Sequence, residues 1–509
     1  MARAVKSAFI LFAATILSKS LGFVRDLAIA YVYGANAVSD SYLMALNIIS
    51  IAFMGLFCVA IQSSFMPIYT SIDKNEGKAK ALDFAGNVIN IIMLASVVVI
   101  VLGWIFTEPL VKLFAMGYTG ERLRLTIEMT RIVLFAVGIV SVTYILKAYL
   151  EIHNFFLITG LMALPYNLAI VISVLLSSKF GVGMLGYGTL FAFFAQMLFL
   201  APFAMKKGFK YRPKLNINDK NLRHMAFAIA PILIGASANQ VNSLVDKNLA
   251  STLNVGAMSA LNYGFKLNVF VTGLFVASIT SVMYPLFSKL GANKNITKLK
   301  ECLSTTINTV TLVTVPISFG AFVLANPIIR VLFERGKFNA SATRMTAEVL
   351  MCYALGMLAS GIRDVVVIVY YSLQDTKTPM KNSILCVAFN IGFNLLLINH
   401  LKAPGLALAS SISAILAVLF LMYNLRKKIG QLGAKSMVIT IFKTSIAAAL
   451  MSAVVLFVFN RLGYMPEAAS LGISVLAGAV VYACAVFLLK VDSLDYFLNI
   501  VRSKLRGNN

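Results

Sequence analysis

The sequence predicts an all-α integral membrane protein, and two observations carry that prediction. Hydrophobic residues make up 60% of the 509, and the mean hydropathy is +0.86, which is more apolar than the core of a soluble protein accounts for. These residues also lie in long runs, and a helix needs about 20 mostly apolar residues to cross the hydrocarbon of a bilayer. We therefore expect about 14 transmembrane helices, arranged as two six-helix lobes around a central cavity plus two C-terminal helices.

The expected spans follow one another along the chain. They lie near residues 8–33, 40–70, 82–107, 125–147, 157–178, 184–204, 225–252, 258–288, 303–325, 345–373, 379–399, 405–425, 436–459 and 466–489. The first begins after Arg3 and Lys6, as a secretory signal peptide would. Because its apolar run is long, contains charges and lacks a clear small-residue cleavage site, we interpret it as a retained span.

The distribution of basic residues supports this count. With the N-terminus in the cytoplasm, most of the 44 Lys and Arg fall in segments that would also be cytoplasmic, in agreement with the positive-inside rule. Missing one helix would invert every later loop and remove the bias. We therefore expect a multi-pass protein with both termini in the cytoplasm.

A basic segment divides the chain between the sixth and seventh spans. It reads "KKGFKYRPKLNINDKNLR" (residues 206–223) and has the composition of a hinge. "EPLVKLFAMG" (108–117) and "NPIIRVLFERG" (326–336) each follow the third span of their half, which suggests parallel repeats of the kind that many transporters contain. We expect an N-lobe at 1–205, a basic cytoplasmic linker at 206–224, a C-lobe at 225–425, and the last two spans with a basic tail at 426–509.

Composition and motifs disfavour several function classes. A net charge of +25 would favour nucleic-acid binding in a soluble protein, but here membrane orientation explains the basic residues. The five cysteines are scattered and the three histidines lie far apart, so neither a zinc site nor a disulfide framework is indicated. The sequence contains no nucleophile elbow, P-loop or paired catalytic carboxylates. We expect a transporter and not an enzyme, with no nucleic-acid partner, no metal and no resident cofactor.

Charged residues inside the spans are the candidate functional residues, since a charge at the centre of a membrane helix costs roughly 2.5–3.5 kcal/mol. The first span carries Lys19, Arg25 and Asp26, the second begins with Asp40, and the eighth contains Lys266. Lys and Arg are the usual protein partners of phosphate. A cavity lined by these cations would therefore suit an anionic substrate.

Helix geometry qualifies the roles within the first span. At 100° per residue, Lys19 and Asp26 share a face, whereas Arg25 lies about 120° away from Lys19. Gly22, between them, could permit a bend that turns Arg25 inward. The alternative is that Arg25 and Asp26 satisfy each other locally and fix neighbouring helices together. We interpret Lys19 and Arg25 as substrate ligands and Asp26 as the partner that orients a cation.

A second polar set lies in the other half of the chain. The seventh span carries Asp246, and the eleventh carries Asn390 and Asn394, one helical turn apart. One carboxylate and two amide oxygens could bind a monovalent cation such as Na⁺ and couple transport to it. Hydrogen bonding between helices explains the asparagines equally well, so both interpretations stay open at this point.

Four segments together give the chain a family resemblance. They are "LSKSLGFVRD" with "YGANAVSDSYLMA" near the N-terminus, "AIQSSFMPIY" (60–69), "VLFERGKFNASATRMTAEVLMCYALG" (331–356) and "YYSLQDTKTPMK" (370–381). They resemble the MurJ (MviN) lipid II flippases of the MOP exporter superfamily, and the resemblance covers nearly the whole chain. It implies alternating access that carries the lipid-linked peptidoglycan precursor from the inner to the outer leaflet of the bacterial cytoplasmic membrane.

The resemblance also implies which residues line the cavity and bind the substrate, namely Lys19, Arg25, Asp40, Ser259 and Lys266. Lys19 stands where the family usually has Arg, and Arg25 matches the Arg of its Gly-Phe-x-Arg-Asp motif. Asp40 matches the aspartate before the second span, Lys266 replaces the usual Arg of the eighth span, and Ser259 lies seven residues before it. The implied partners are a polyprenyl-diphosphate saccharide, membrane lipids and proteins of cell-wall synthesis, a process that determines cell shape.

The second span departs from the family pattern. The family commonly has two arginines and a glutamate where this chain has Phe53, Met54 and Cys58. Fewer arginines weaken the anion site, because Lys lacks the bidentate fork that Arg offers to phosphate. Another lipid-linked oligosaccharide is therefore an alternative substrate. An ion-coupled multidrug-type exporter, which would favour acidic cavity residues, and a non-transporting membrane scaffold are the remaining alternatives.

Overall fold

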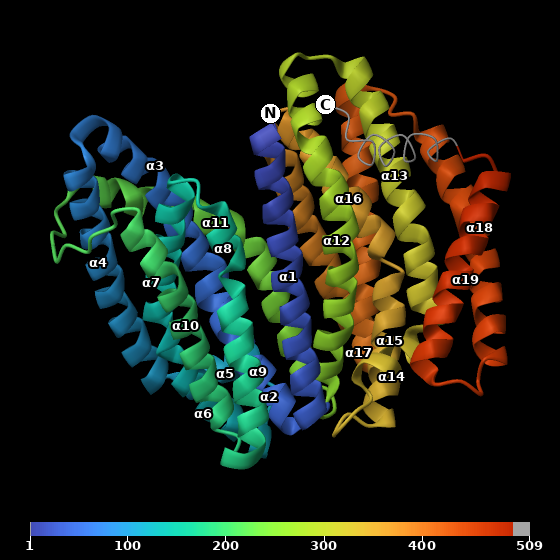
Figure 1. Cartoon of the computed structure of the whole chain (residues 1–509), viewed down its shortest axis with the longest axis horizontal. Helices are drawn as coiled ribbons and strands as arrows, with labels where there is room; N and C mark the ends of the chain where they lie inside the picture. Colours follow the sequence, from blue (N-terminus) through green and yellow to red (C-terminus); the bar gives the residue numbers. More distant parts are fainter. Residues whose placement is uncertain (1, 492–509) are drawn as a thin grey trace. The chain divides into compact units, whose positions relative to one another are not determined.

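The computed structural model describes residues 2–491, without the side chains of residues 2–16, 55–56, 230–232 and 234–239. Every regular element within that range is a helix, which confirms the predicted all-α fold (Figure 1). Contacts divide the chain into two compact units. The first comprises the residues up to Ser259 together with Arg335–Phe338, and the second comprises Ala260–Glu334 and the residues from Asn339 onward.

The first unit is built from twelve successive helical segments within the described residues. They are α1 (Ala2–Tyr33), α2 (Ala37–Ile49), the π-helix η1 (Ser50–Cys58), α3 (Val59–Glu76), α4 (Lys78–Ile105), α5 (Thr107–Phe114), α6 (Gly120–Leu134), α7 (Ala136–Ile152), α8 (Phe156–Leu161), α9 (Ala163–Phe180), α10 (Met184–Lys206) and α11 (Lys220–Ser251). Aromatic side chains fill its core, where Phe65 stacks on Phe84 and Tyr149 lies edge-on to Tyr69 and Phe209.

The second unit continues the chain with eight helices in the described range. They are α12 (Ala257–Ala292, whose first turn belongs to the first unit), α13 (Ile296–Val323), α14 (Ala325–Phe333), α15 (Ala340–Ala354), α16 (Met357–Ser372), α17 (Lys377–Ile429), α18 (Ala434–Arg461) and α19 (Glu467–Leu488). Its core is aliphatic, because one face of α16 buries Val365, Val366 and Val369 against α13 and α17.

Length and hydropathy identify nine helices in the described residues that could each cross a membrane, and two bent pairs raise that number to eleven. The pairs are α6 with α7, bent by 44°, and α15 with α16, bent by 43°. The protein is therefore a multi-pass membrane protein. The total of fourteen spans stays a prediction.

Helix α17 contains two of the expected spans. Lys402 interrupts it with φ +52° and ψ −130°, between the predicted spans 379–399 and 405–425. On either side, Cys386 contacts the carbonyl of Ser413, Asn390 donates to Ser410, and Gly405 packs against Leu397. The residue numbers of these pairs add to a nearly constant value, which is the pattern of an antiparallel hairpin. Its two ends, near residues 380 and 425, therefore lie side by side.

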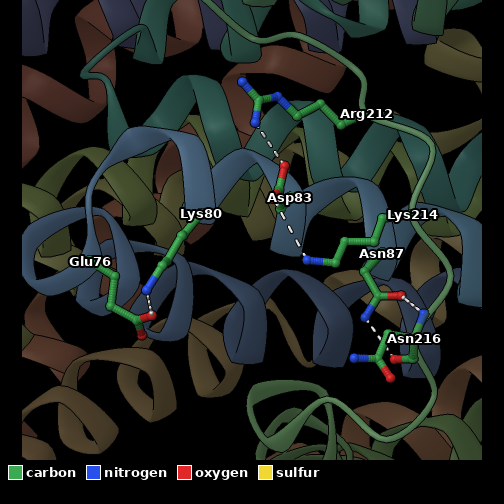
Figure 2. Close-up of polar contacts among 7 residues, drawn as sticks. All are labelled: Glu76, Lys80, Asp83, Asn87, Arg212, Lys214 and Asn216. Atoms are coloured by element: carbon green, nitrogen blue, oxygen red, sulfur yellow. Dashed lines mark hydrogen bonds and ion pairs between the residues drawn. The ribbon is translucent and has the colours of Figure 1, made fainter.

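Residues 212–216 of the basic segment after α10 are bonded to α4, as Figure 2 shows. Arg212 and Lys214 reach Asp83 at 2.9 Å and 3.6 Å, and Asn87 exchanges two hydrogen bonds with the backbone of Asn216. Gly86 allows the closest approach, because a Cβ there would overlap the carbonyl of Arg212. This part of the predicted linker thus forms the surface of the first unit. The lobe boundaries at residues 205 and 225 stay a prediction, although contacts place α11 in the first unit.

Candidate functional site

The most completely bonded candidate residue is Asp40, in the first turn of α2. Its Oδ1 accepts hydrogen bonds from the backbone N–H of Ser259 at 2.9 Å and from the Ser259 hydroxyl at 2.6 Å. Its Oδ2 accepts the backbone N–H of Gly256 at 2.7 Å. Asp40 and Ser259 are both fully buried. The structure therefore brings together two residues that the sequence singled out 219 positions apart.

This carboxylate acts as an N-cap supplied from outside the helix that it caps. Gly256 and Ser259 flank the first residues of α12, where backbone N–H groups have no partner within the helix. A negative charge is favourable at that end because of the helix dipole. Gly256 has φ +91°, and a Cβ there would lie 2.7 Å from the carbonyl oxygen of Ala35, so the position requires glycine.

Neighbouring groups fix the segment that presents these donors. Arg122 donates to the carbonyl of Leu253, and Ser251 accepts the backbone N–H of Gly117 at 3.0 Å. Tyr118 donates to the backbone carbonyl of Asp40. Burial, with the nearby Asp40 carboxylate adding to it, raises the pKa of Tyr118 well above its usual value, so the phenol stays a neutral donor.

Arg25 of α1 is held in a second polar contact. Its Nε and Nη2 both donate to Oδ1 of Asp26, at 3.1 Å and 2.9 Å, and its Nη1 donates to Oδ1 of Asn167 on α9 at 3.2 Å. These bonds occupy three of the five N–H groups of the guanidinium. This geometry fits both interpretations of the pair, Asp26 as a partner that orients Arg25 for a ligand and Asp26 as a local partner in a contact that joins α1 to α9, so the role of Asp26 stays a prediction.

Lys19 and Gly22 lie on the same helix as Arg25. Lys19 is exposed. A Cβ at Gly22 would lie 3.6 Å from Nδ2 of Asn167, so Gly22 packs beside the amide that holds Arg25. α1 runs as one unbroken helix from Ala2 to Tyr33 in the described residues, and the helix continues through Gly22.

The other candidate residues are divided between the two units. Lys266 is half-buried on α12 in the second unit. Asp246 of α11 belongs to the first unit, where Nδ2 of Asn242 donates to it at 3.2 Å. Asn390 and Asn394 belong to the second unit, in which Asn394 donates to Asn390 at 2.9 Å. Local hydrogen bonds thus account for part of the polar capacity of Asp246, Asn390 and Asn394. The described residues contain no cluster of three or more His, Cys, Asp or Glu suited to a metal.

Phe53, Met54 and Cys58, which stand where the resembling family commonly has charged residues, lie in the π-helix η1. Phe53 and Met54 pack against an apolar cluster that includes the buried Cys58 and Val133. π-Helical turns are rare and occur often at functional sites. The region is therefore apolar where the resemblance would lead one to expect cations.

Sequence reasoning missed Asn167, Arg122 and Tyr118. Asn167 is 4% exposed on α9, and a lone amide in an apolar run is a weak signal because membrane helices often contain one. Arg122 and Tyr118 lie in the segment between the third and fourth expected spans, where basic and aromatic residues are common at a membrane interface. Their partners, the carbonyls of Leu253 and Asp40, lie far from them in the sequence.

Comparisons with known proteins give a consistent picture. A model of the lipid II flippase MurJ family matches residues 29–484. A probable lipid II flippase MurJ of Buchnera aphidicola subsp. Acyrthosiphon pisum is 28% identical over 453 residues, covering 87% of this chain and 88% of the relative. A solved structure of a lipid II flippase MurJ in an inward closed conformation superposes with a TM-score of 0.81 at 26% identity, over 95% of this chain and 100% of that one. An inward-facing multidrug resistance MATE family transporter of the MOP superfamily shares the fold, with a TM-score of 0.66 at 16% identity over 84% of this chain and 99% of that one.

Proposed function

Because this chain belongs to the lipid II flippase MurJ family, we propose that it moves lipid II from the inner to the outer leaflet of a bacterial cytoplasmic membrane. The observation that carries the proposal is the family match over most of the chain, combined with a partly buried arginine, Arg25, whose hydrogen bonds among the described residues leave two of its five N–H donors for a ligand. The chain is a transporter by this proposal and catalyses no covalent reaction.

The proposed substrate contacts are cationic. Arg25, oriented by Asp26 and Asn167, donates its remaining N–H groups to a diphosphate oxygen, and Lys19 and Lys266 add positive charge. Charge-assisted hydrogen bonds of this kind offset the cost of bringing the diphosphate out of water. The polyprenyl tail stays in the lipid phase.

Asp40 and Ser259 have a different role in this proposal. Since both are buried and bonded to each other, they are closed to substrate in the state described. We assign them to a latch that joins α2 to the start of α12. Alternating access requires contacts that hold one state and break in the other, and buried hydrogen bonds of this type suit that purpose.

The test is complementation of a bacterium depleted of its own lipid II flippase, together with an assay for lipid II in the outer leaflet. Wild-type protein restores growth and lipid II exposure, whereas Arg25→Ala abolishes both without loss of membrane insertion, because the diphosphate loses its bidentate donor. Arg124→Ala on the exposed face of α6 is the matched control and retains transport. Full transport by Arg25→Ala would contradict the assignment.

A second candidate substrate is another polyprenyl-diphosphate saccharide. The observation that favours it is that Phe53, Met54 and Cys58 form an apolar region where the family commonly has two arginines and a glutamate. Failure of a well-expressed and inserted protein to restore lipid II exposure would support it. Uptake of other polyprenyl-diphosphate saccharides into proteoliposomes would then identify the substrate.

We also propose that a monovalent cation such as Na⁺ drives transport, with the carboxylate of Asp246 in the first unit as an oxygen ligand suited to a hard cation. Replacing Na⁺ by choline should slow substrate flipping in proteoliposomes, and Asp246→Asn should remove that dependence. Equal rates in Na⁺ and choline at fixed pH would exclude Na⁺ coupling.

A further inference from the structure

A cavity of ≈ 450 Å³ in the second unit lies apart from every residue assigned above to transport. It opens where the two ends of the α17 hairpin meet beside the end of α16. Its polar lining includes Lys381 and Asn382 from the beginning of α17, and Lys427 and Lys428 from its end. The hairpin therefore gathers residues that are more than 40 positions apart in the sequence.

The cavity has an excess of positive charge. Three lysines line it, and no carboxylate is among the lining residues. Lys428 is neutralised by Asp375, at 2.6 Å, while Lys427 lies over the ring of Tyr423 at 4.5 Å. Neither Lys381 nor Lys427 has an ion-pair partner within the described part of the chain. Two ammonium groups thus remain for an anion.

A buried amide distinguishes this cavity from an ordinary cluster of surface lysines. Asn382 is 7% exposed and lines the cavity, yet its Oδ1 has no hydrogen-bond partner among the described residues. An unsatisfied buried polar atom costs about 1–3 kcal/mol, so such groups usually have a partner. Rotating the amide by 180° exchanges its oxygen and nitrogen, which lets it present either a donor or an acceptor to a ligand.

The apolar side of the cavity indicates that the ligand also has an apolar part. Leu385 lines it one helical turn from Lys381, Phe420 lines it two turns from Lys427, and both remain more than a third exposed. Basic pockets between membrane helices at the interface bind the headgroups of anionic lipids. We propose that this cavity is a phosphate-binding site filled by an anionic phospholipid, with the phosphate at Lys381, Asn382 and Lys427 and an acyl chain along Phe420.

The test measures ligand binding to the full-length protein in neutral detergent by calorimetry. The probes are dioctanoyl phosphatidylglycerol, dioctanoyl phosphatidylcholine and inorganic phosphate. The variants are Lys381→Gln/Lys427→Gln, which removes the two available charges, and Asn382→Leu, which keeps the branched shape of the side chain and removes the amide. Lys289→Gln/Lys298→Gln, two exposed lysines elsewhere in the second unit, is the matched control.

Phosphatidylglycerol should bind the wild type and the control equally, and the double lysine variant should bind it about tenfold or more weakly, since charge-assisted hydrogen bonds are lost. Asn382→Leu should also weaken binding, which charge attraction alone would not predict. Equal binding of inorganic phosphate would assign the site to the free anion instead of a lipid. Phosphatidylcholine that binds as well as phosphatidylglycerol would overturn the proposal, and so would a double lysine variant that binds as well as its control. If Asn382→Leu fails to fold, the single exposed change Lys427→Gln takes its place. It should weaken phosphatidylglycerol binding, and unchanged binding would contradict the proposal.

Discussion

At the scale of single residues, we expect the hydrogen bonds of the Asp40 carboxylate to stabilise the folded state. Asp40→Asn replaces one acceptor oxygen by an NH₂ group that faces a backbone N–H, so at least one buried donor of Gly256 or Ser259 loses its partner. Such a loss costs about 1–3 kcal/mol. We expect a lower unfolding midpoint and faster amide hydrogen exchange in residues 252–259.

Glu121→Gln is the control for that experiment, because Glu121 is exposed in the first turn of α6 and its charge lies outside the latch. It should leave both the midpoint and the exchange of residues 252–259 unchanged. Wild-type exchange rates in Asp40→Asn would show that the latch contributes nothing to the state described.

At the scale of elements, Asp375 fixes the start of α17 to its end. It accepts hydrogen bonds from Thr378 and from Lys428, and these outweigh the effect of burial, lowering the pKa of its carboxyl to about 2. Because the pKa is lower in the folded state, the stabilisation is present above the unfolded pKa of about 3.9 and is lost as the pH falls towards 2.

The free energy of unfolding of wild type should therefore exceed that of Asp375→Asn by about 1–2 kcal/mol near neutral pH, after allowance for solvent screening at the half-exposed Lys428. The difference should shrink between about pH 4 and pH 2. Urea titrations at several pH values measure it, with the exposed Glu301→Gln as the control. A difference that persists unchanged at pH 2 would contradict the role of the ion pair.

The sequence predicted helical elements better than the contacts between them. The break at Lys402 was predictable, because the apolar runs on either side are each long enough to span a membrane. Arg25 and Asp40 were identifiable because charge is costly in an apolar run. The bond from Arg25 to Asn167 and the cap that Asp40 gives to α12 were not, because they depend on helix packing, and polar packing between membrane helices leaves no periodic pattern.

The same reasoning applies to the basic segment after α10, which composition predicts to be a hinge. Asn87 and Asn90 of α4 donate to the carbonyls of Asn216 and Lys214, and these bonds fix residues 214–216 to the first unit. Polar residues on an exposed helix face would ordinarily be interpreted as solvated. Here they instead bind the backbone of residues 214 and 216, and their spacing of three residues puts both amides on one side of α4.

At the scale of the whole molecule, the number and direction of the spans decide where every site lies. Fourteen spans with both termini inside place the basic segment 206–223 and the loop around Asp375 in the cytoplasm, and place Arg122 and Lys337 outside. Green fluorescent protein fused after Lys210 or Gln374 should fluoresce, and alkaline phosphatase should be active when fused after Tyr118 or Lys337. An active phosphatase after Gln374 would mean that one helix of the second half does not span the membrane. The cavity between the ends of α17 would then face the outer leaflet, and the anionic lipid that fills it would have to come from that side.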